Sequence, residues 1–170
     1  MSALMVLMGV TTLFLDEAFA ESKPEIGVDS AFVVSASTGQ TVYRLHTDRK
    51  LSPGGFTKIM AAMVVLDRMH DRAELRNRIT VTRDVASKGK LFKKGDQITV
   101  RDLLAAMLVA DSDEAAVALA VYSAENGTAF GEAMNTKAQE LELENTNYTT
   151  VTGKYDTPQY TTTEDMGYLV

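Results

Sequence analysis

The sequence predicts one domain of the mixed α/β class, in which helices form the core and a small antiparallel sheet packs beside them. Two short runs at 31–35 and 41–45 are rich in β-branched and aromatic residues, and the loop between them contains a glycine, as in a β-hairpin. Residues 57–69 are apolar on all sides, which is typical of a helix buried in the middle of a domain. A chain of 170 residues with 45% hydrophobic and 24% charged residues can form one well-packed core.

The N-terminal segment is predicted to be a signal peptide that precedes the domain. Residues 3–15 are almost continuously apolar, and the tripeptide Ala-Phe-Ala before Glu21 has the pattern of a cleavage site. The apolar stretch is too short for a comfortable membrane span. No basic residue precedes it, and Asp16 and Glu17 lie inside the cleavage region, so a buried or frayed N-terminal helix is the alternative. We therefore assign 1–20 to a signal peptide and 21–170 to the domain, and we expect the protein to be exported.

The rest of the chain alternates between capped helices and turns. The predicted elements after the first helix are a strand at 79–82, a loop at 88–97, helices at 101–109 and 113–125, and a further helix after 128. Thr99 and Asp102 resemble a capping box, Ser112 is a good N-cap, and Thr128 can cap the last of these helices. That last helix carries its apolar residues on one face: Phe130, Met134, Ala138 and Leu141. A Thr- and Tyr-rich stretch from 145 onward predicts loop or short strand, and a new helix starts near the end.

Composition excludes several kinds of site. The net charge is −6 and the basic residues are scattered, which argues against a nucleic-acid partner. The absence of cysteine excludes disulfides, cysteine–zinc sites and thiol nucleophiles. The two histidines, His46 and His70, lack the spacing of a metal-binding pair. We expect neither a metal nor any other cofactor.

Lys58 is the first candidate for chemistry, because it lies in the first turn of the predicted buried helix. The segment 53–60 reads Pro-Gly-Gly-Phe-Thr-Lys-Ile-Met. Burial and the positive end of the helix dipole both disfavour an ammonium group, so we expect the pKa of Lys58 to fall. Such a lysine can serve as general base for a hydroxyl three residues earlier, as in Ser-x-x-Lys enzymes, but that position is Gly55. The alternative is a lysine whose side chain extends from the helix end to water.

Several segments, taken in order, resemble the low-molecular-mass penicillin-binding proteins, which are serine D-alanyl-D-alanine carboxypeptidases of the peptidase S11 type. The opening of that family, Pro-Ala-Ser-x-Thr-Lys-Ile-Met, is similar to 53–60. Its Gly-Asp and Thr-Val-x-Asp-Leu-Leu run resembles 92–104, and its Ser-Gly-Asn-Asp-Ala-Ala-x-Ala-Leu-Ala helix resembles 111–120. The hairpin and residues 160–166 also fit. The resemblance covers 28–170 and implies the N-terminal portion of a penicillin-binding, β-lactamase-like transpeptidase fold, with a helical core against an incomplete antiparallel sheet.

The resemblance also assigns roles, and the departures fall on those positions. Gly55 stands where the family has its nucleophilic serine, and Lys58 stands at the general-base position. Asp111 and Asp113 replace the serine and the asparagine of the second motif. The third motif, Lys-Thr-Gly, would lie beyond 170, and we give the reversed Thr-Gly-Lys at 152–154 no role.

The functional prediction is a bacterial cell-envelope or periplasmic carboxypeptidase homologue that is inactive. The resemblance implies peptidoglycan stem peptides ending in D-Ala-D-Ala as ligands, together with β-lactams. Without a hydroxyl at Gly55 no acyl-enzyme can form there. We expect Asp111 to pair with Lys58 and keep it protonated. Asp113 has no amide donor for substrate and adds a repelling charge.

Three alternatives stay open at this point. The chain could be a non-catalytic module that binds peptidoglycan or cell-wall enzymes, or the product of a partial or decayed gene. A β-lactamase is a further enzyme with the same implied fold, although the motifs resemble the carboxypeptidases more closely. The family's later strands are expected to be missing, which would leave the hairpin with an open edge and an uncovered apolar face.

Overall fold

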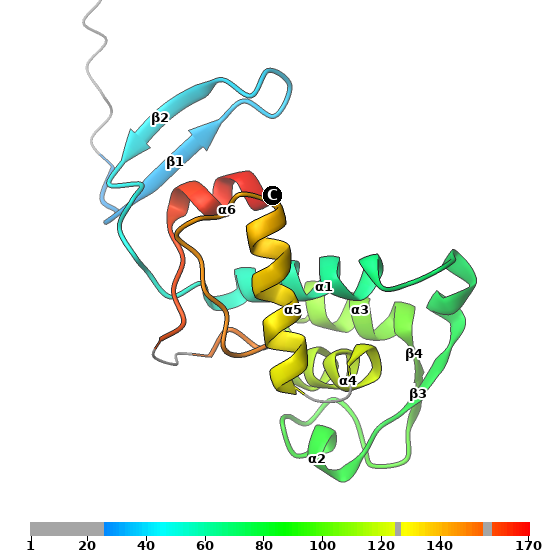
Figure 1. Ribbon diagram of the computed structural model, residues 1–170. Coiled ribbons are helices and arrows are strands. Elements are labelled where there is room, and N and C mark those ends of the chain that lie inside the picture. The colour runs from blue at the N-terminus through cyan, green and yellow to red at the C-terminus, as the bar shows by residue number, and fades with distance from the viewer. Residues whose placement is uncertain (1–25, 125–126, 155–157) are drawn as a thin grey trace, which may run out of the picture.

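The computed structural model describes residues 26–124, 127–154 and 158–170, and the predicted signal peptide lies outside these ranges. Four helices form the centre of the molecule: α1 (Thr57–Asp67), α3 (Val100–Val109), α4 (Asp113–Ser123) and α5 (Gly127–Glu140). The remaining elements are short and are arranged around these helices (Figure 1). They are β1 (Ala31–Val34), β2 (Thr41–Leu45), η1 (Gly54–Phe56), η2 (Arg72–Arg76), β3 (Arg78–Thr80), α2 (Arg83–Ala86), β4 (Gln97–Thr99) and α6 (Thr163–Leu169).

The core lies where α1 and α4 meet their neighbours. α1 contacts α3, α4 and α5, and α4 contacts α3 and α5 as well. Most of the largest fully buried apolar side chains come from these helices, among them Met60, Leu103, Leu119 and Phe130, and Tyr148 joins them from the segment after α5. The prediction that α1 is apolar all round because it is buried is confirmed along most of its length, although Leu66 near its end is exposed.

The predicted hairpin is confirmed as the antiparallel pair β1–β2, in which Val33 faces Tyr43 across the ladder. It projects from the helical core and rests against α6 (Figure 1). The ring of Phe32 meets that of Tyr168 edge to face, at 5.4 Å between centroids. Within the described ranges no third strand pairs with this hairpin, and Val42 is 68% exposed. The sheet is therefore small and open, as expected from the sequence.

The element boundaries differ from the predicted ones in several places. α3 begins at Val100, directly after its cap Thr99, and the predicted strand is found as β3, paired with β4. α4 ends at Ser123 rather than 125, because Ala124 is already extended. Gly127 begins α5 instead of ending α4, and the side chain of Thr128, the predicted cap, lies outside what the structure describes. The elements η2 and α2 were not predicted, because each forms little more than one turn held by a local cap.

The C-terminal part of the chain forms one short helix after a segment with little regular structure. The predicted helix start near the C-terminus is confirmed as α6, which Thr162 caps by accepting a hydrogen bond from the Asp165 N–H at 3.1 Å. The described parts of the segment after α5, 145–154 and 158–161, form two isolated bridges, Leu51 with Thr161 and Asn147 with Tyr160. None of the helices in the described part of the chain is both long and apolar enough to cross a bilayer.

Candidate active site

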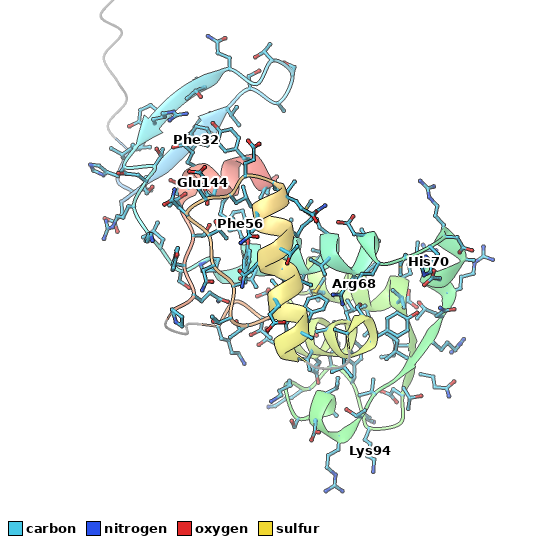
Figure 2. All side chains as sticks on the ribbon, in the orientation of Figure 1. Phe32, Phe56, Arg68, His70, Lys94 and Glu144 are labelled. Atoms are coloured by element: carbon cyan, nitrogen blue, oxygen red, sulfur yellow. The ribbon has the colours of Figure 1, made fainter. Side chains whose placement is uncertain are left out.

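The start of α1 is built by a short helical turn rather than by a loop. η1 runs directly into α1, and Gly54 adopts the left-handed region with φ of +50°. Gly55 lies in this turn, and Lys58 follows in the first turn of α1. Phe56 lies on the side of the helical core that faces the hairpin residue Phe32 (Figure 2). This geometry places Gly55 and Lys58 on one short, rigid stretch of backbone.

The turn between α3 and α4 supplies the acidic residues of the site. Asp111 has a positive φ of 52°, and Ser112 caps α4 by accepting a hydrogen bond from the Ala115 N–H at 3.1 Å. The prediction that Ser112 is an N-cap is therefore confirmed. Because Ser112 turns toward the helix, its two neighbours Asp111 and Asp113 are free to turn toward Lys58.

Lys58 is the centre of an ion-pair cluster. Its side chain is only 4% exposed, and Nζ lies 2.5 Å from Asp111 Oδ1 and 2.9 Å from Asp113 Oδ1. Nζ also donates a hydrogen bond to the backbone oxygen of Asp111 at 2.8 Å. The expected pairing of Asp111 with Lys58 is present, and Asp113 joins it.

The pKa of Lys58 does not fall as the sequence suggested. Burial disfavours its ammonium form and on its own would lower the pKa, but the hydrogen bonds and charges of Asp111 and Asp113 outweigh burial. The pKa of Lys58 therefore lies above its ordinary value of 10.5. The lower pKa expected from the helix dipole and burial is therefore wrong, whereas the expectation that Asp111 keeps Lys58 protonated agrees with the direction found.

Lys154, which belongs to the reversed Thr-Gly-Lys that was given no role, is a further member of the cluster. Its Nζ lies 2.9 Å from Asp113 Oδ2, so Asp113 bridges two lysines. Burial alone would raise the pKa of Asp113, but these two ammonium groups hold that pKa below its ordinary value of 3.8. Gly153 brings Lys154 into place, because a Cβ at this position would lie 1.8 Å from the Gly54 carbonyl oxygen. Only a glycine permits this approach.

A groove of about 370 Å³ opens over the cluster. Gly55, Lys58 and Asp111 line it together with apolar residues: Phe56, Ile59, Met107 and Leu108. A Cβ built on Gly55 would lie 3.8 Å from Asp111 Oδ1, which is ordinary van der Waals contact. The backbone therefore has room for a side chain at 55, and packing does not require glycine there.

The structure thus brings the four predicted site residues into one cluster and adds Lys154. None of the described residues that line the groove carries a hydroxyl group. Ser52 lines a different cavity, of about 330 Å³, between the hairpin, α6 and the start of α1. Among the described residues no group of three or more histidine or acidic side chains is arranged to hold a metal ion. The arrangement offers a buried cation, two carboxylates and apolar walls.

Comparisons with known proteins agree with this architecture. Residues 17–170 match the profile of the peptidase S11 family, described as D-alanyl-D-alanine carboxypeptidase. The carboxypeptidase DacC of Escherichia coli is 30% identical over 92% of this chain, and DacF of Bacillus subtilis is 27% identical over 96%. The chain spans only 43% of the first relative and 45% of the second.

Solved structures give the same result. Penicillin-binding protein 6B of Escherichia coli superimposes with a TM-score of 0.79 at 31% identity, over 89% of this chain and 51% of its own. A variant of the Streptomyces DD-transpeptidase has a TM-score of 0.79 at 29% identity, over 86% of this chain and 61% of its own. The chain therefore has the mixed α/β fold of these proteins over part of their length, and it belongs to the peptidase S11 family of D-alanyl-D-alanine carboxypeptidases.

Proposed function

We propose that this chain is a D-alanyl-D-alanine carboxypeptidase homologue that forms no acyl-enzyme and is catalytically inactive. One observation carries the proposal: the residue three positions before the buried Lys58 is Gly55, which has no nucleophile. The groove at this point has the lysine of a Ser-x-x-Lys site but lacks its hydroxyl. Acyl transfer through a covalent intermediate needs both groups.

The neighbouring hydroxyl groups do not replace the missing serine. Ser112 accepts the capping hydrogen bond of α4, which holds its side chain against the helix. Ser52 lies in the other cavity. Thr57 is fully buried, with 0% of its surface exposed. These three positions support the proposal that no substitute nucleophile faces the groove.

The class of ligand is inferred from family membership. We propose that the groove accommodates peptidoglycan stem peptides ending in D-Ala-D-Ala, without hydrolysing them. The test is release of free D-alanine from such a peptide by the purified chain, beside a Lys58→Met variant as background. We expect equal release from both proteins. Release by the unmodified chain that disappears in Lys58→Met would show that the site is active.

A second candidate function is binding without turnover, and the open groove favours it. Asp111 is 77% exposed and four apolar residues form the walls, so a peptide can still enter. Titration calorimetry with muropeptides ending in D-Ala-D-Ala should then give saturable binding. Leu108→Asp, which changes a wall residue that is 51% exposed, should weaken it. No heat at millimolar muropeptide would eliminate this candidate.

The cellular location is also a proposal. The signal peptide assigned to 1–20 would deliver the domain 21–170 to the periplasm or cell envelope, where peptidoglycan is found. Sequencing the N-terminus of the protein recovered from that compartment tests this assignment. A mature chain that begins at Glu21 is expected, and an intact Met1 on protein retained in the cytoplasm would contradict it.

A further inference from the structure

We infer that Asp111 and Asp113 form a second block on catalysis, independent of Gly55, because together they occupy every N–H donor of Lys58. The inference rests on the proposed function, since it concerns the same site. Its consequence is specific: a serine restored at 55 cannot use Lys58 as its general base until both carboxylates are removed. Gly55 and the acidic pair would then each be sufficient to stop acyl transfer.

The donor inventory of Lys58 is the first step. A lysine ammonium has three N–H donors and no acceptor. Nζ has three oxygen partners: Asp111 Oδ1 at 2.5 Å, the Asp111 backbone oxygen at 2.8 Å and Asp113 Oδ1 at 2.9 Å. Because the side chain is 4% exposed, water has little access to replace any of them. Each donor therefore has one partner, and none is left for a substrate or a hydroxyl.

Loss of a proton from this lysine is the second step. A general base must present a lone pair to the hydroxyl that it deprotonates. If Lys58 loses a proton here, its lone pair faces one of three oxygen atoms. Such a contact is repulsive, so the neutral amine is disfavoured while the two carboxylates remain.

Competition for the restored hydroxyl is the third step. A Cβ at 55 would lie 3.8 Å from Asp111 Oδ1, the same oxygen that accepts a hydrogen bond from Lys58. The hydroxyl of a serine at 55 would extend about one bond further and can donate to that carboxylate. A hydroxyl that donates to Asp111 is directed away from Lys58. Asp111 would thus interfere with both partners of the catalytic pair.

Removing Asp111 alone does not release Lys58. Asp113 holds Lys58 through one carboxylate oxygen and Lys154 through the other. This second bridge fixes the Asp113 carboxylate beside Lys58 even when Asp111 is absent. Both acidic residues must therefore change, and the natural replacements are the serine and the asparagine that the family has at these two positions.

The decisive experiment measures the titration of Lys58 itself. In the full chain labelled with ¹³C and ¹⁵N, the Nζ shift of Lys58 is followed against pH in the unmodified protein and in Asp111→Ser/Asp113→Asn, with the signal assigned by its loss in Lys58→Met. Lys58 should titrate above 10.5 in the unmodified protein. It should titrate below 10.5 in the double variant, because burial is then uncompensated. An unchanged midpoint overturns the inference.

The chain offers an internal control for this titration. Lys137 also pairs with two carboxylates, Asp67 at 2.7 Å and Glu140 at 3.2 Å, and it is more exposed than Lys58. Its midpoint should be the same in the unmodified protein and in Asp111→Ser/Asp113→Asn. A joint shift of Lys58 and Lys137 would indicate a general change of the fold, and the inference would be rejected on that result.

Labelling with a fluorescent penicillin separates the two blocks. Gly55→Ser alone should label at least about a hundredfold more slowly than Gly55→Ser/Asp111→Ser/Asp113→Asn, since a positioned general base contributes roughly 10²–10⁴ in rate. Equal labelling of these two variants overturns the inference but leaves the proposed inactivity of the natural chain intact. Labelling of the unmodified chain would refute the proposed inactivity, whatever the titration of Lys58 shows.

Discussion

Gly153 is the residue on which the shape of the site depends most directly. It has φ of +79°, and a Cβ there would overlap the carbonyl of Gly54. We predict that Gly153→Ala lowers the free energy of unfolding by about 2 kcal/mol or more, from left-handed strain and the clash together. Urea denaturation measures this value.

A matched glycine gives the opposite prediction. Gly131 lies within α5, and nothing lies within 4 Å of the position of its Cβ. Gly131→Ala should therefore raise stability by about 0.5–1 kcal/mol, because alanine loses less backbone entropy in a helix. If both substitutions change the free energy of unfolding in the same direction, the result would contradict the close approach of Gly153 to Gly54 that the structure shows.

The ion-pair cluster predicts how stability depends on pH at the acidic end. The folded-state pKa of Asp113 lies below 3.8, so its charged interactions stabilise the fold fully above that value and are lost as the pH falls through the folded pKa. Asp113→Asn should be less stable than the unmodified chain at neutral pH, and the difference should shrink at acidic pH. Urea denaturation between about pH 2 and 7 tests this. A difference that stays constant over the range would contradict it.

The contribution of Lys58 to stability depends on pH in the opposite direction, because it is lost as the pH rises. Its folded-state pKa lies above 10.5, so its contribution is fully present below 10.5 and is lost as the pH rises through the folded value. Over the neutral range both Lys58 and Asp113 are charged. The cluster therefore stabilises the fold over the neutral range, and we propose that the same contacts keep Lys58 from acting as a base.

At the scale of single elements, the N-cap of α4 links stability to the site. Ser112→Ala removes the acceptor for the Ala115 N–H and should cost about 1 kcal/mol in urea denaturation. Ser123 is a control in the same helix, since its hydroxyl donates to the Leu119 oxygen at 2.8 Å near the other end. Ser123→Ala should change stability by less than about 0.5 kcal/mol. Equal losses would mean that the cap does not determine the start of α4.

Elements with local signals could be predicted from the sequence. The caps Thr99 and Ser112, the hairpin and the all-round apolar α1 each depend on residues within a few positions of one another. Helix ends were less predictable: Ala124 is already extended, whereas the pattern of the sequence predicted helix to 125. Differences of one or two residues at a helix end are usual.

Contacts between distant residues could not be predicted in this way. Glu114 is 2% exposed and accepts a hydrogen bond from the Leu91 N–H at 2.9 Å, which fixes the loop before β4. Lys154 reaches Asp113 only because Gly153 passes so close to Gly54. The pairing of Lys58 with Asp111 was predicted through the family resemblance, whereas the contribution of Lys154 had no signal in the sequence.

For the molecule as a whole, the two parts should differ in local stability. The helical core is closely packed, whereas β1–β2 has two strands and an exposed Val42. A two-stranded sheet is marginal by itself, so we predict that its amide protons exchange with solvent well before those of α1 and α4. Hydrogen exchange followed by mass spectrometry measures this. Equal protection in the hairpin and the core would contradict it.

The proposed inactivity can be tested by measuring the intact mass of the purified chain after incubation with excess penicillin. We predict that the unmodified protein shows no added mass, because Gly55 provides no nucleophile and Lys58 is held between two carboxylates. A mass increase of one penicillin on the unmodified chain, located by peptide mapping, would reveal a nucleophile at a position other than 55. That result would contradict the proposed inactivity.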